Sequence, residues 1–306
     1  MEVSILGLGS WRTFEVIPRE QGAQVMAAAR ASGIDFLDDA RYNDRTGKAP
    51  LRTGYSEVVF GELFRAAGWK RDEVVVSNKL WWEFWPDQSA AEEVDGSLGR
   101  MQFDYLDLVY SERPPAGLEV ADVVGAVTDL VVAGKARAWG VLNWSTQQIA
   151  EAVRVARAEQ LPLPCAAQLP YSVVLRSPVE DAPMSVALAD ADACVVASWA
   201  LAGGALTGKY AAGPAAGGRI SGELDRPAVV PAVRAAHALG ELAERMDTTA
   251  PALALAFTLA NPRVATVLFG ATGPEQVREN AQAADVLNRL GGSELAELRA
   301  IGSGGA

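Results

Sequence analysis

The strongest constraint on the fold of this 306-residue chain is a regular alternation of short β-branched runs with longer, alanine-rich stretches of helical periodicity. Strands that alternate with helices are joined by right-handed crossovers, which produce a parallel sheet. The candidate strands comprise residues 3–8, 35–38, 74–78, 106–111, 138–142, 166–169, 194–198 and 266–270. Eight such strands close into a barrel more readily than they extend an open sheet. We therefore predict an α/β fold, a (β/α)8 TIM barrel that forms a single domain over residues 1–306.

Helical periodicity fills the segments between these strands. The candidate helices comprise residues 20–32, 55–67, 89–101, 120–134, 146–159, 183–190, 227–246, 250–260 and 274–286. A Rossmann fold would instead need a glycine-rich phosphate loop directly after its first strand. Here Gly7-Leu8-Gly9 supplies only two of those glycines before Ser10 and Trp11, so this turn favours the barrel.

The charge balance and the cysteine and histidine content narrow the function classes. With 27 basic and 38 acidic residues the formal charge is −11, which disfavours nucleic acid and anionic membranes because phosphate binding depends on clustered Lys and Arg. Apolar runs stay short of the ~20 residues that span a bilayer, and the start lacks a signal-peptide pattern. Cys165 and Cys194 are expected to be buried, reduced thiols, and the single histidine, His237, falls in a predicted helix. We therefore expect a cytoplasmic protein with a small-molecule substrate and no metal site.

Polar side chains gather where the predicted strands end. Asp38 closes the second strand with Tyr42 just beyond it, Lys79 follows the third strand, and Glu112 follows the fourth. In a parallel β/α barrel these ends lie on one face, where active sites are built. A carboxylate, a phenol, an ammonium and a second carboxylate form a set suited to proton transfer. We therefore predict an enzyme with these four residues as candidate catalytic groups.

Several motifs, in order along nearly the whole chain, resemble those of the aldo-keto reductase family. They are Gly7-Leu8-Gly9-Ser10-Trp11, Gly33-Ile34-Asp35-Phe36-Leu37-Asp38, Ser56-Glu57 with Phe60-Gly61, Gly140-Val141-Leu142-Asn143-Trp144, Gln168 with Tyr171-Ser172, the segment 202–210, and the segment 270–280. Each motif alone is weak, whereas the series in register is specific to the family. The resemblance implies a barrel that binds NADPH across its carboxyl-terminal face and reduces a carbonyl group by hydride transfer.

The resemblance also implies which residues hold the cofactor. The implied contacts are Ser10, Trp11, Asp38, Asn143, Gln168, Leu201, Gly203, Lys209, Thr272, Gln276, Glu279 and Asn280. Thr272 precedes a predicted helix, and a helix N-terminus favours a phosphate group. A 2′-phosphate needs Lys or Arg, for which Arg278, Arg219 and Arg226 are candidates, so we expect NADPH to be preferred over NADH.

The chemistry that the resemblance implies needs a tyrosine as proton donor, with a lysine and an aspartate beside it. Lys79 and Asp38 match that pair, and a nearby ammonium makes the phenol proton easier to share at neutral pH. The family's spacing of five positions from the aspartate to the tyrosine is shortened to four at Tyr42. Tyr42 is favoured as the acid. Tyr55, after an apparent insertion over residues 44–52, is one alternative, and a site in which neither tyrosine is the acid is another.

Two further positions depart from the family pattern. Glu112 stands where the fourth strand usually ends in histidine. Glutamate there resembles the steroid double-bond-reducing branch and implies a protonated carboxyl that polarises an enone. A turn toward solvent, or an ion pair with Arg113 or Arg137, is the alternative. Ser198 stands where the family stacks an aromatic ring on the nicotinamide, with Trp199 one residue later on the opposite face of the strand.

Trp81 and Trp82 follow Lys79 in a loop at the active face and are candidates for the wall of the substrate pocket. They predict a bulky or aromatic substrate, the alternative being a hydrophobic cluster that covers the barrel rim. The leading prediction is thus NADPH-dependent reduction of a carbonyl group. Two alternatives stay open: reduction of a conjugated C=C or an imine, suggested by Glu112, and a non-catalytic cofactor-binding regulatory protein, like the potassium-channel β subunits of the same family.

Overall fold

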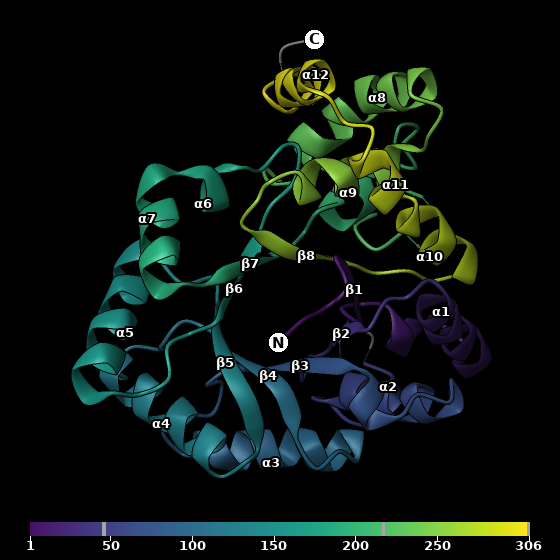
Figure 1. Cartoon of the computed structure of the whole chain (residues 1–306). Helices are drawn as coiled ribbons and strands as arrows, with labels where there is room; N and C mark the ends of the chain where they lie inside the picture. Colours follow the sequence, from purple (N-terminus) through teal and green to yellow (C-terminus); the bar gives the residue numbers. More distant parts are fainter. Residues whose placement is uncertain (45–46, 216–217, 305–306) are drawn as a thin grey trace.

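The computed structural model describes residues 1–44, 47–215 and 218–304 and shows eight parallel strands closed into one barrel (Figure 1). The strands are β1 (Leu6–Gly9), β2 (Phe36–Asp38), β3 (Val75–Leu80), β4 (Leu106–Ser111), β5 (Ala136–Leu142), β6 (Ala166–Pro170), β7 (Cys194–Ser198) and β8 (Val264–Phe269). They pair in chain order, and β1 closes the ring by pairing with β8. The predicted (β/α)8 barrel is confirmed, with strand ends that differ from the prediction by a few residues.

Helices surround the barrel (Figure 1). They are α1 (Arg19–Ala31), α2 (Tyr55–Ala66), α3 (Ala90–Met101), α4 (Val120–Val132), α5 (Thr146–Glu159), α6 (Ser177–Glu180), α7 (Ala182–Ala191), α8 (Val230–Arg245), α9 (Ala250–Leu259), α10 (Pro274–Ala281), α11 (Ala283–Leu287) and α12 (Gly292–Gly302), with 3₁₀ turns η1 (Phe14–Val16), η2 (Arg71–Glu73) and η3 (Ala202–Thr207). The helix predicted over 274–286 is divided into α10 and α11. The prediction missed α6, which is one turn long, and α12, which begins with a glycine, a poor helix former.

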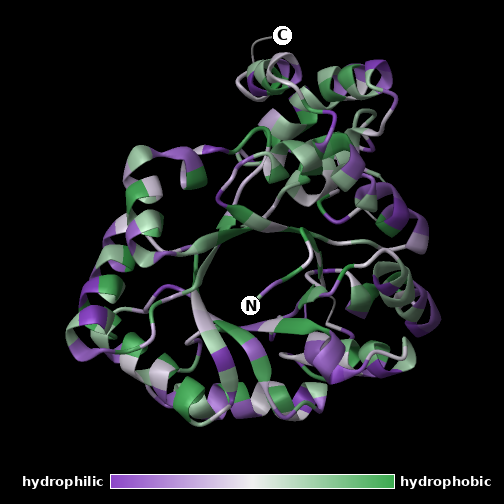
Figure 2. Ribbon diagram, in the orientation of Figure 1, coloured by the Kyte–Doolittle hydropathy of each residue, from purple (hydrophilic) through white to green (hydrophobic). Residues whose placement is uncertain are grey.

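Local sequence explains where several helices begin and how they pack. Ser89 with Glu92, and Ser145 with Gln148, form capping boxes at the starts of α3 and α5. The peripheral helices carry hydrophobic and hydrophilic residues on different faces (Figure 2). Helix α9 is apolar on nearly every side because it packs among β8, α8, α10 and α11.

The core has two parts because successive strand residues point to opposite sides of the barrel wall. One part lies between the strands and the helices. The other fills the barrel interior and contains Phe36, Leu108, Tyr110, Leu142, Ala166, Val196 and Leu268. Asp38 is two residues beyond Phe36 on β2, so its side chain also points inward, at the carboxyl-terminal end of the strand. The apolar interior therefore supports a polar layer at that end of the barrel.

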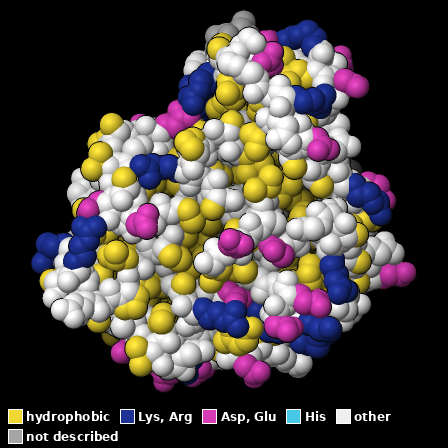
Figure 3. Space-filling model, in the orientation of Figure 1, with side chains coloured by type: hydrophobic (Ala, Val, Ile, Leu, Met, Phe, Trp, Pro, Cys, Tyr) yellow, Lys and Arg dark blue, Asp and Glu magenta, His cyan; other side chains and the backbone are white. Residues whose placement is uncertain are grey.

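The surface carries mixed charge. On the face shown in Figure 3, the described Lys and Arg side chains are dispersed among Asp and Glu and do not merge into one basic patch. Within the described ranges, none of the helices is long and apolar enough to cross a membrane. The expected burial of the cysteines is wrong for Cys165, which is exposed, while Cys194 is half-buried; both are free thiols. They lie just before β6 and at the start of β7, where the strands emerge at the amino-terminal end of the barrel.

A glycine in α2 marks the close approach of α2 and α3. A methyl group at Gly61 would lie 2.2 Å from the carbonyl oxygen of Met101. We predict that Gly61→Ala lowers the free energy of unfolding by about 1–3 kcal/mol, because two helix backbones must move apart. Gly125 on α4 is the matched control, since no atom that its methyl group would meet lies within 4 Å. Gly125→Ala should raise the free energy of unfolding by about 0.5–1 kcal/mol. Urea unfolding followed by circular dichroism measures both, and equal effects of the two substitutions would contradict the prediction.

Candidate active site

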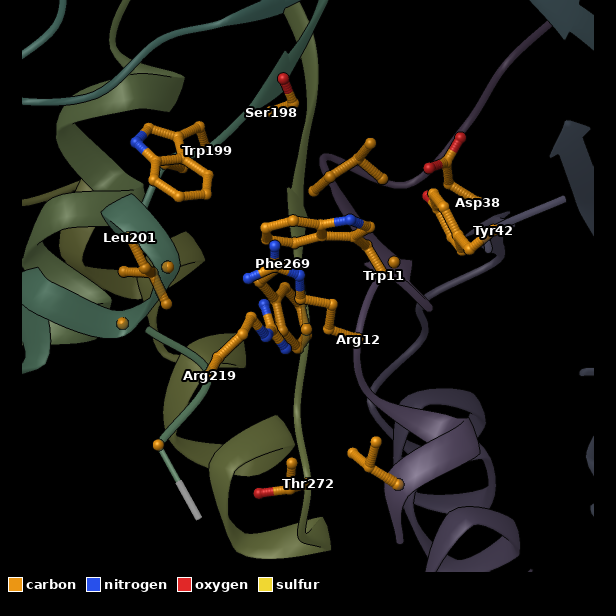
Figure 4. A pocket seen from close by; sticks show the side chains of 18 of the residues that line it. Trp11, Arg12, Asp38, Tyr42, Ser198, Trp199, Leu201, Arg219, Phe269 and Thr272 are labelled. Atoms are coloured by element: carbon orange, nitrogen blue, oxygen red, sulfur yellow. The ribbon is translucent and has the colours of Figure 1, made fainter. Parts of the chain in front are cut away.

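A cavity of about 1290 Å³ opens at the carboxyl-terminal ends of the strands (Figure 4). Residues at the ends of β1, β2, β3, β5, β6, β7 and β8 and in the loops after them line it, together with η3, the segment 218–226 and α10. This volume exceeds the range of roughly 300–1,000 Å³ that is usual for small-ligand pockets. The cavity therefore has room for a large ligand, or for two ligands side by side.

Lys79 and Asp38 form a buried ion pair on the cavity wall, with 2.7 Å between Lys79 Nζ and Asp38 Oδ2. The Lys79 ammonium also donates to the carbonyl oxygen of Asp39 at 3.0 Å. The other carboxylate oxygen of Asp38 accepts hydrogen bonds from Ser77 Oγ at 2.7 Å and Gln168 Nε2 at 3.1 Å. Side chains from β2, β3 and β6 thus hold one positive charge in place, and both oxygens of its counter-ion are hydrogen-bonded.

Tyr42 lies beside this pair on the cavity wall (Figure 4). Its ring centre is 5.9 Å from Lys79 Nζ and 6.1 Å from the ring centre of Trp81. Burial raises the pKa of the Tyr42 phenol well above its usual range, and the carboxylates of Asp38 and Asp39 raise it further. The phenol therefore carries its proton at neutral pH, which is the state required of a proton donor.

The alternative tyrosine, Tyr55, lies outside the cavity. It opens α2, and its hydroxyl accepts a hydrogen bond from Arg19 at 2.8 Å. The apparent insertion begins only after Tyr42, with Asn43 and Thr53 bridged as an antiparallel pair at its base. Residues 45–46 of the insertion lie outside the described ranges. The added residues thus leave Tyr42 at the site and place Tyr55 on the outer helical layer.

Most of the residues implied as cofactor contacts line the same cavity. They are Trp11, Asp38, Asn143, Gln168, Leu201, Gly203, Lys209, Thr272, Gln276, Glu279 and Asn280. Figure 4 shows Trp11 across the middle of the pocket, with Asp38 and Tyr42 on one side and Trp199 and Leu201 on the other. Thr272 lies at a separate end, where its backbone N–H donates to Gln276 Oε1 at 2.8 Å. The cavity therefore joins the cluster of Asp38, Lys79 and Tyr42 to the start of α10.

Two predicted site residues lie behind the cavity wall. Ser10 is buried, and its hydroxyl donates to the carboxylate of Asp39. Trp82 is packed in the core, where its Nε1 donates to Ser111 Oγ at 2.9 Å. The left-handed backbone of Trp82, with φ of 59°, separates it from Trp81, which does line the cavity. Neither residue is among those that line the cavity, and the contacts of Ser10 with the cofactor and of Trp82 with the substrate stay predictions.

Glu112 follows β4 and is half-buried next to the wall, but is not among the residues that line the cavity. Its Oε2 lies 3.5 Å from Nδ2 of Asn143, which does line it. Burial raises the pKa of Glu112, although hydrogen bonds and the charge of Arg113 oppose the shift. Arg113 donates to the Asn143 carbonyl, and Arg137 pairs with a different carboxylate. Glu112 is therefore placed to act on the cavity through Asn143.

Ser198 and Trp199 both line the cavity, although adjacent strand residues should face opposite sides. The reason is that β7 ends at Ser198 and Trp199 adopts a left-handed conformation with φ of 59°. The Trp199 ring meets the Trp11 ring edge-on at 5.8 Å. Other non-glycine residues with positive φ at this face are Arg12, Trp82, Asn143 and Ala202. Such conformations cost about 1–3 kcal/mol each and cluster at functional sites.

Two cations on the wall, Lys209 and Arg219, have no carboxylate within ion-pair distance in the described part of the chain. Arg219 donates to Thr13 Oγ1 at 2.8 Å. Burial lowers the pKa of both cations, because the charged forms lose hydration. Arg226, a candidate for the 2′-phosphate, lines the cavity, whereas Arg278 does not. The carboxylate of Glu15, which also lines the cavity, acts on Arg219 from beyond ion-pair distance, so neither cation is directly ion-paired within the described residues.

The sequence prediction missed several residues of this region. Arg12, Glu15 and Asp44 line the cavity from the segments after β1 and β2. Each of them follows a barrel strand, where active-site residues are expected, but their spacing matched no motif. Asp39 is fully buried, with Oδ2 unpartnered among the described residues. Burial raises its pKa well above the usual range, and the nearby charge of Glu57 adds to the shift.

Comparisons with known proteins cover nearly the whole chain. A family model described as the aldo/keto reductase family matches residues 5–302. A probable voltage-gated potassium channel subunit beta from Oryza sativa subsp. japonica is 32% identical, over 98% of this chain and 93% of that protein. An aldo/keto reductase from Klebsiella pneumoniae in complex with NADP and acetate superposes with a TM-score of 0.74 at 26% identity, over 97% of this chain and 90% of that chain. A complex of an aldo-keto reductase from that organism with NADPH gives the same values.

The buried carboxyl of Asp39 predicts a pH-dependent stability difference. A carboxyl whose pKa is raised by folding contributes stability below its unfolded pKa of about 3.9, and that contribution is lost as the pH rises through the folded pKa. Asparagine does not ionise, so Asp39→Asn should gain stability relative to wild type as the pH rises from about 4 toward 8. Urea unfolding at several pH values measures this difference. The control Asp129→Asn changes an exposed carboxylate on α4. The prediction is contradicted if the stability of Asp129→Asn relative to wild type changes with pH by the same amount.

Proposed function

The chain belongs to the aldo/keto reductase family, and on that premise we propose that it is an NADPH-dependent oxidoreductase that reduces the carbonyl group of a bulky or aromatic small molecule. The observation that carries the proposal is the buried Lys79–Asp38 ion pair beside the protonated phenol of Tyr42 on the wall of a large cavity. Such a set supplies a proton to an oxygen that gains negative charge. The Klebsiella relatives bound to NADP and NADPH support the choice of cofactor.

The cavity residues fit a nicotinamide dinucleotide. Lys209 and Arg219 are partly desolvated cations that lack a carboxylate partner in the described chain, so a bound diphosphate would balance their charge. A side chain at Gly204 would meet Lys209 Nζ at 2.8 Å, so this glycine leaves room for the ammonium. Thr272 lies just before the N-terminus of α10, where a second phosphate is favoured. We assign Lys209, Arg219 and Thr272 to the phosphates and the cavity face of α10 to the adenine.

Bound NADPH would supply a hydride to the substrate carbon, and the residues of the chain would handle the accompanying proton. Tyr42 Oη donates that proton as the carbonyl oxygen gains negative charge. Lys79 stabilises the phenolate that forms, because its ammonium is 5.9 Å from the ring centre. Asp38 holds the ammonium in place and offsets its charge, so the phenol keeps its proton until the substrate oxygen takes it.

The proposed substrate class follows from the aromatic part of the wall. Trp11, Tyr42 and Trp81 all line the cavity. Aromatic side chains offer large apolar faces and favour offset or edge-to-face contact with other rings. A bulky or aromatic carbonyl compound therefore suits this wall better than a small, fully polar sugar. We also propose that the protein acts in the cytoplasm, where NADPH is maintained and free thiols such as Cys165 persist.

The raised pKa of Glu112 favours a second candidate reaction, reduction of a conjugated C=C or an imine. A protonated carboxyl donates a hydrogen bond and strengthens the polarisation of an enone. Since Glu112 lies behind Asn143, this effect would reach the cavity through the Asn143 amide.

The rice relative named as a channel subunit favours a different class, a cofactor-binding regulatory protein. Such a function uses the cofactor cavity but not the proton-transfer set. Tight NADPH binding without oxidation of NADPH by aldehydes, ketones, enones or imines would support this class over the reductase.

We predict that Tyr42→Phe lowers kcat for an aromatic aldehyde by about 100- to 10,000-fold, because the proton donor is lost. The dissociation constant for NADPH should change less than about twofold, since the ring remains. Absorbance at 340 nm and fluorescence titration measure the two quantities. Tyr55→Phe is the matched control and should leave kcat unchanged, because Tyr55 contacts Arg19 outside the cavity. The proposal fails if Tyr42→Phe keeps wild-type activity.

We predict that Glu112→Gln changes kcat for the same aldehyde by less than about threefold, because Glu112 does not line the cavity. Glutamine keeps the size of the side chain but has no acidic proton to donate. Parallel assays with a cyclic enone and a cyclic imine test the second candidate. A loss of more than about tenfold for the enone, with the aldehyde unaffected, would favour C=C reduction over carbonyl reduction.

A further inference from the structure

Arg41 is a buried cation directly before Tyr42. Its side chain is only 3% exposed, which is rare for arginine and requires a partner. One guanidinium nitrogen donates to Glu93 Oε1 at 3.0 Å, and the other lies 3.3 Å from Glu83 Oε2. Arg41 itself does not line the cavity, whereas Tyr42 does. Arg41 therefore anchors, from behind the wall, the segment that carries the phenol.

Glu93 connects this anchor to the loop after β3. It lies on α3 with its side chain 3% exposed. Besides Arg41, its Oε1 accepts the backbone N–H of Trp81 at 2.9 Å, and its Oε2 accepts that of Trp82 at 3.2 Å. One buried carboxylate thus joins the loop that carries Tyr42 to the loop that carries Trp81, and the two rings lie 6.1 Å apart.

The backbone of Tyr42 is held on both sides of its side chain. Its N–H donates to the Ala40 carbonyl at 2.9 Å and to Ser56 Oγ at 3.2 Å. Its carbonyl accepts the Gly54 N–H at 2.9 Å. These hydrogen bonds hold the backbone after Arg41, and the ion pair with Glu93 holds the chain at Arg41 itself. Displacing the segment would separate the buried charges of Arg41 and Glu93, which is unfavourable.

We propose that the Arg41–Glu93 pair is the positioning device that holds Tyr42 within reach of Lys79 despite the shortened spacing from Asp38. The inference rests on the proposed reductase function and adds two residues that act through Tyr42 without touching the reacting atoms. Loss of the pair displaces the phenol relative to the ammonium and leaves the cofactor side of the cavity intact. Misplacement of a reacting group by about 1 Å costs on the order of 100-fold in rate.

Asp107 provides a matched control for Glu93. It is a buried carboxylate on β4 that accepts a backbone N–H, that of Val76, at 2.9 Å. It also pairs with Arg71 at 2.6 Å. It is the second residue of its strand, so it lies near the amino-terminal end of the barrel, opposite the cavity. Asp107→Asn and Glu93→Gln therefore each remove one buried negative charge, at opposite ends of the barrel.

The test compares wild type, Glu93→Gln, Arg41→Lys and Asp107→Asn as full-length proteins, with NADPH and 4-nitrobenzaldehyde as the probe substrate. We expect Glu93→Gln to lower kcat about 10- to 100-fold while the dissociation constant for NADPH changes less than twofold. Arg41→Lys keeps the positive charge but loses the planar guanidinium that reaches two carboxylates, and should give an intermediate kcat. Asp107→Asn should keep kcat within about twofold of wild type. An equal loss of kcat in Asp107→Asn and Glu93→Gln, or no loss in Glu93→Gln, overturns the proposal.

A second readout separates this inference from the proposed function. Hydrogen exchange of the backbone amides of Tyr42 and Gly54, measured with NADPH present, does not depend on turnover. Both amides should exchange at least about tenfold faster in Glu93→Gln than in wild type or Asp107→Asn. If wild type oxidises no NADPH with any carbonyl, the reductase function fails, and this exchange alone decides the positioning role. Unchanged protection of both amides in Glu93→Gln refutes it.

Discussion

The active face depends on one positive charge held inside the barrel, at Lys79. A buried ammonium is costly unless it is paired and hydrogen-bonded, and the end of β2 supplies Asp38 and the residue after it supplies the Asp39 carbonyl for this purpose. The pairing of Asp38 with Ser77 in the β2–β3 register places both side chains inside the barrel. A slip of one residue would turn them outward. The closure of the barrel and the chemistry of the site therefore depend on the same strand register.

Around this charge the structure keeps several groups in unfavourable states. Trp199 has a left-handed backbone, Asp39 is a buried carboxyl, and Lys209 and Arg219 lack carboxylate partners within the described residues. Each lowers the stability of the free protein, and the large apolar core compensates. An anionic ligand that contacts Lys209 and Arg219 would recover part of this cost, so binding and stability are coupled at this face.

The placement of Asp38, Lys79 and Tyr42 on one wall could be predicted because strand ends in a parallel barrel share a face. The same rule did not predict where the Trp82 side chain lies, because its direction depends on a left-handed backbone conformation that the residue type does not indicate. Nor did it predict that the Ser10 hydroxyl donates to a buried carboxylate and does not line the cavity. Loop residues follow individual backbone angles, for which a sequence pattern carries little information.

By itself, the sequence determined the barrel and the strand ends that carry the polar groups, because hydrophobic periodicity and strand alternation are local properties. Only the tertiary structure decided that Arg41 meets Glu93, 52 residues away, and that Arg219 lies against the cavity without a carboxylate partner in the described chain. In the sequence, Glu93 is one more acid near a helix start, a pattern that indicates a solvated surface. A charge acquires its role from the groups that surround it after folding, and those groups come from distant parts of the chain.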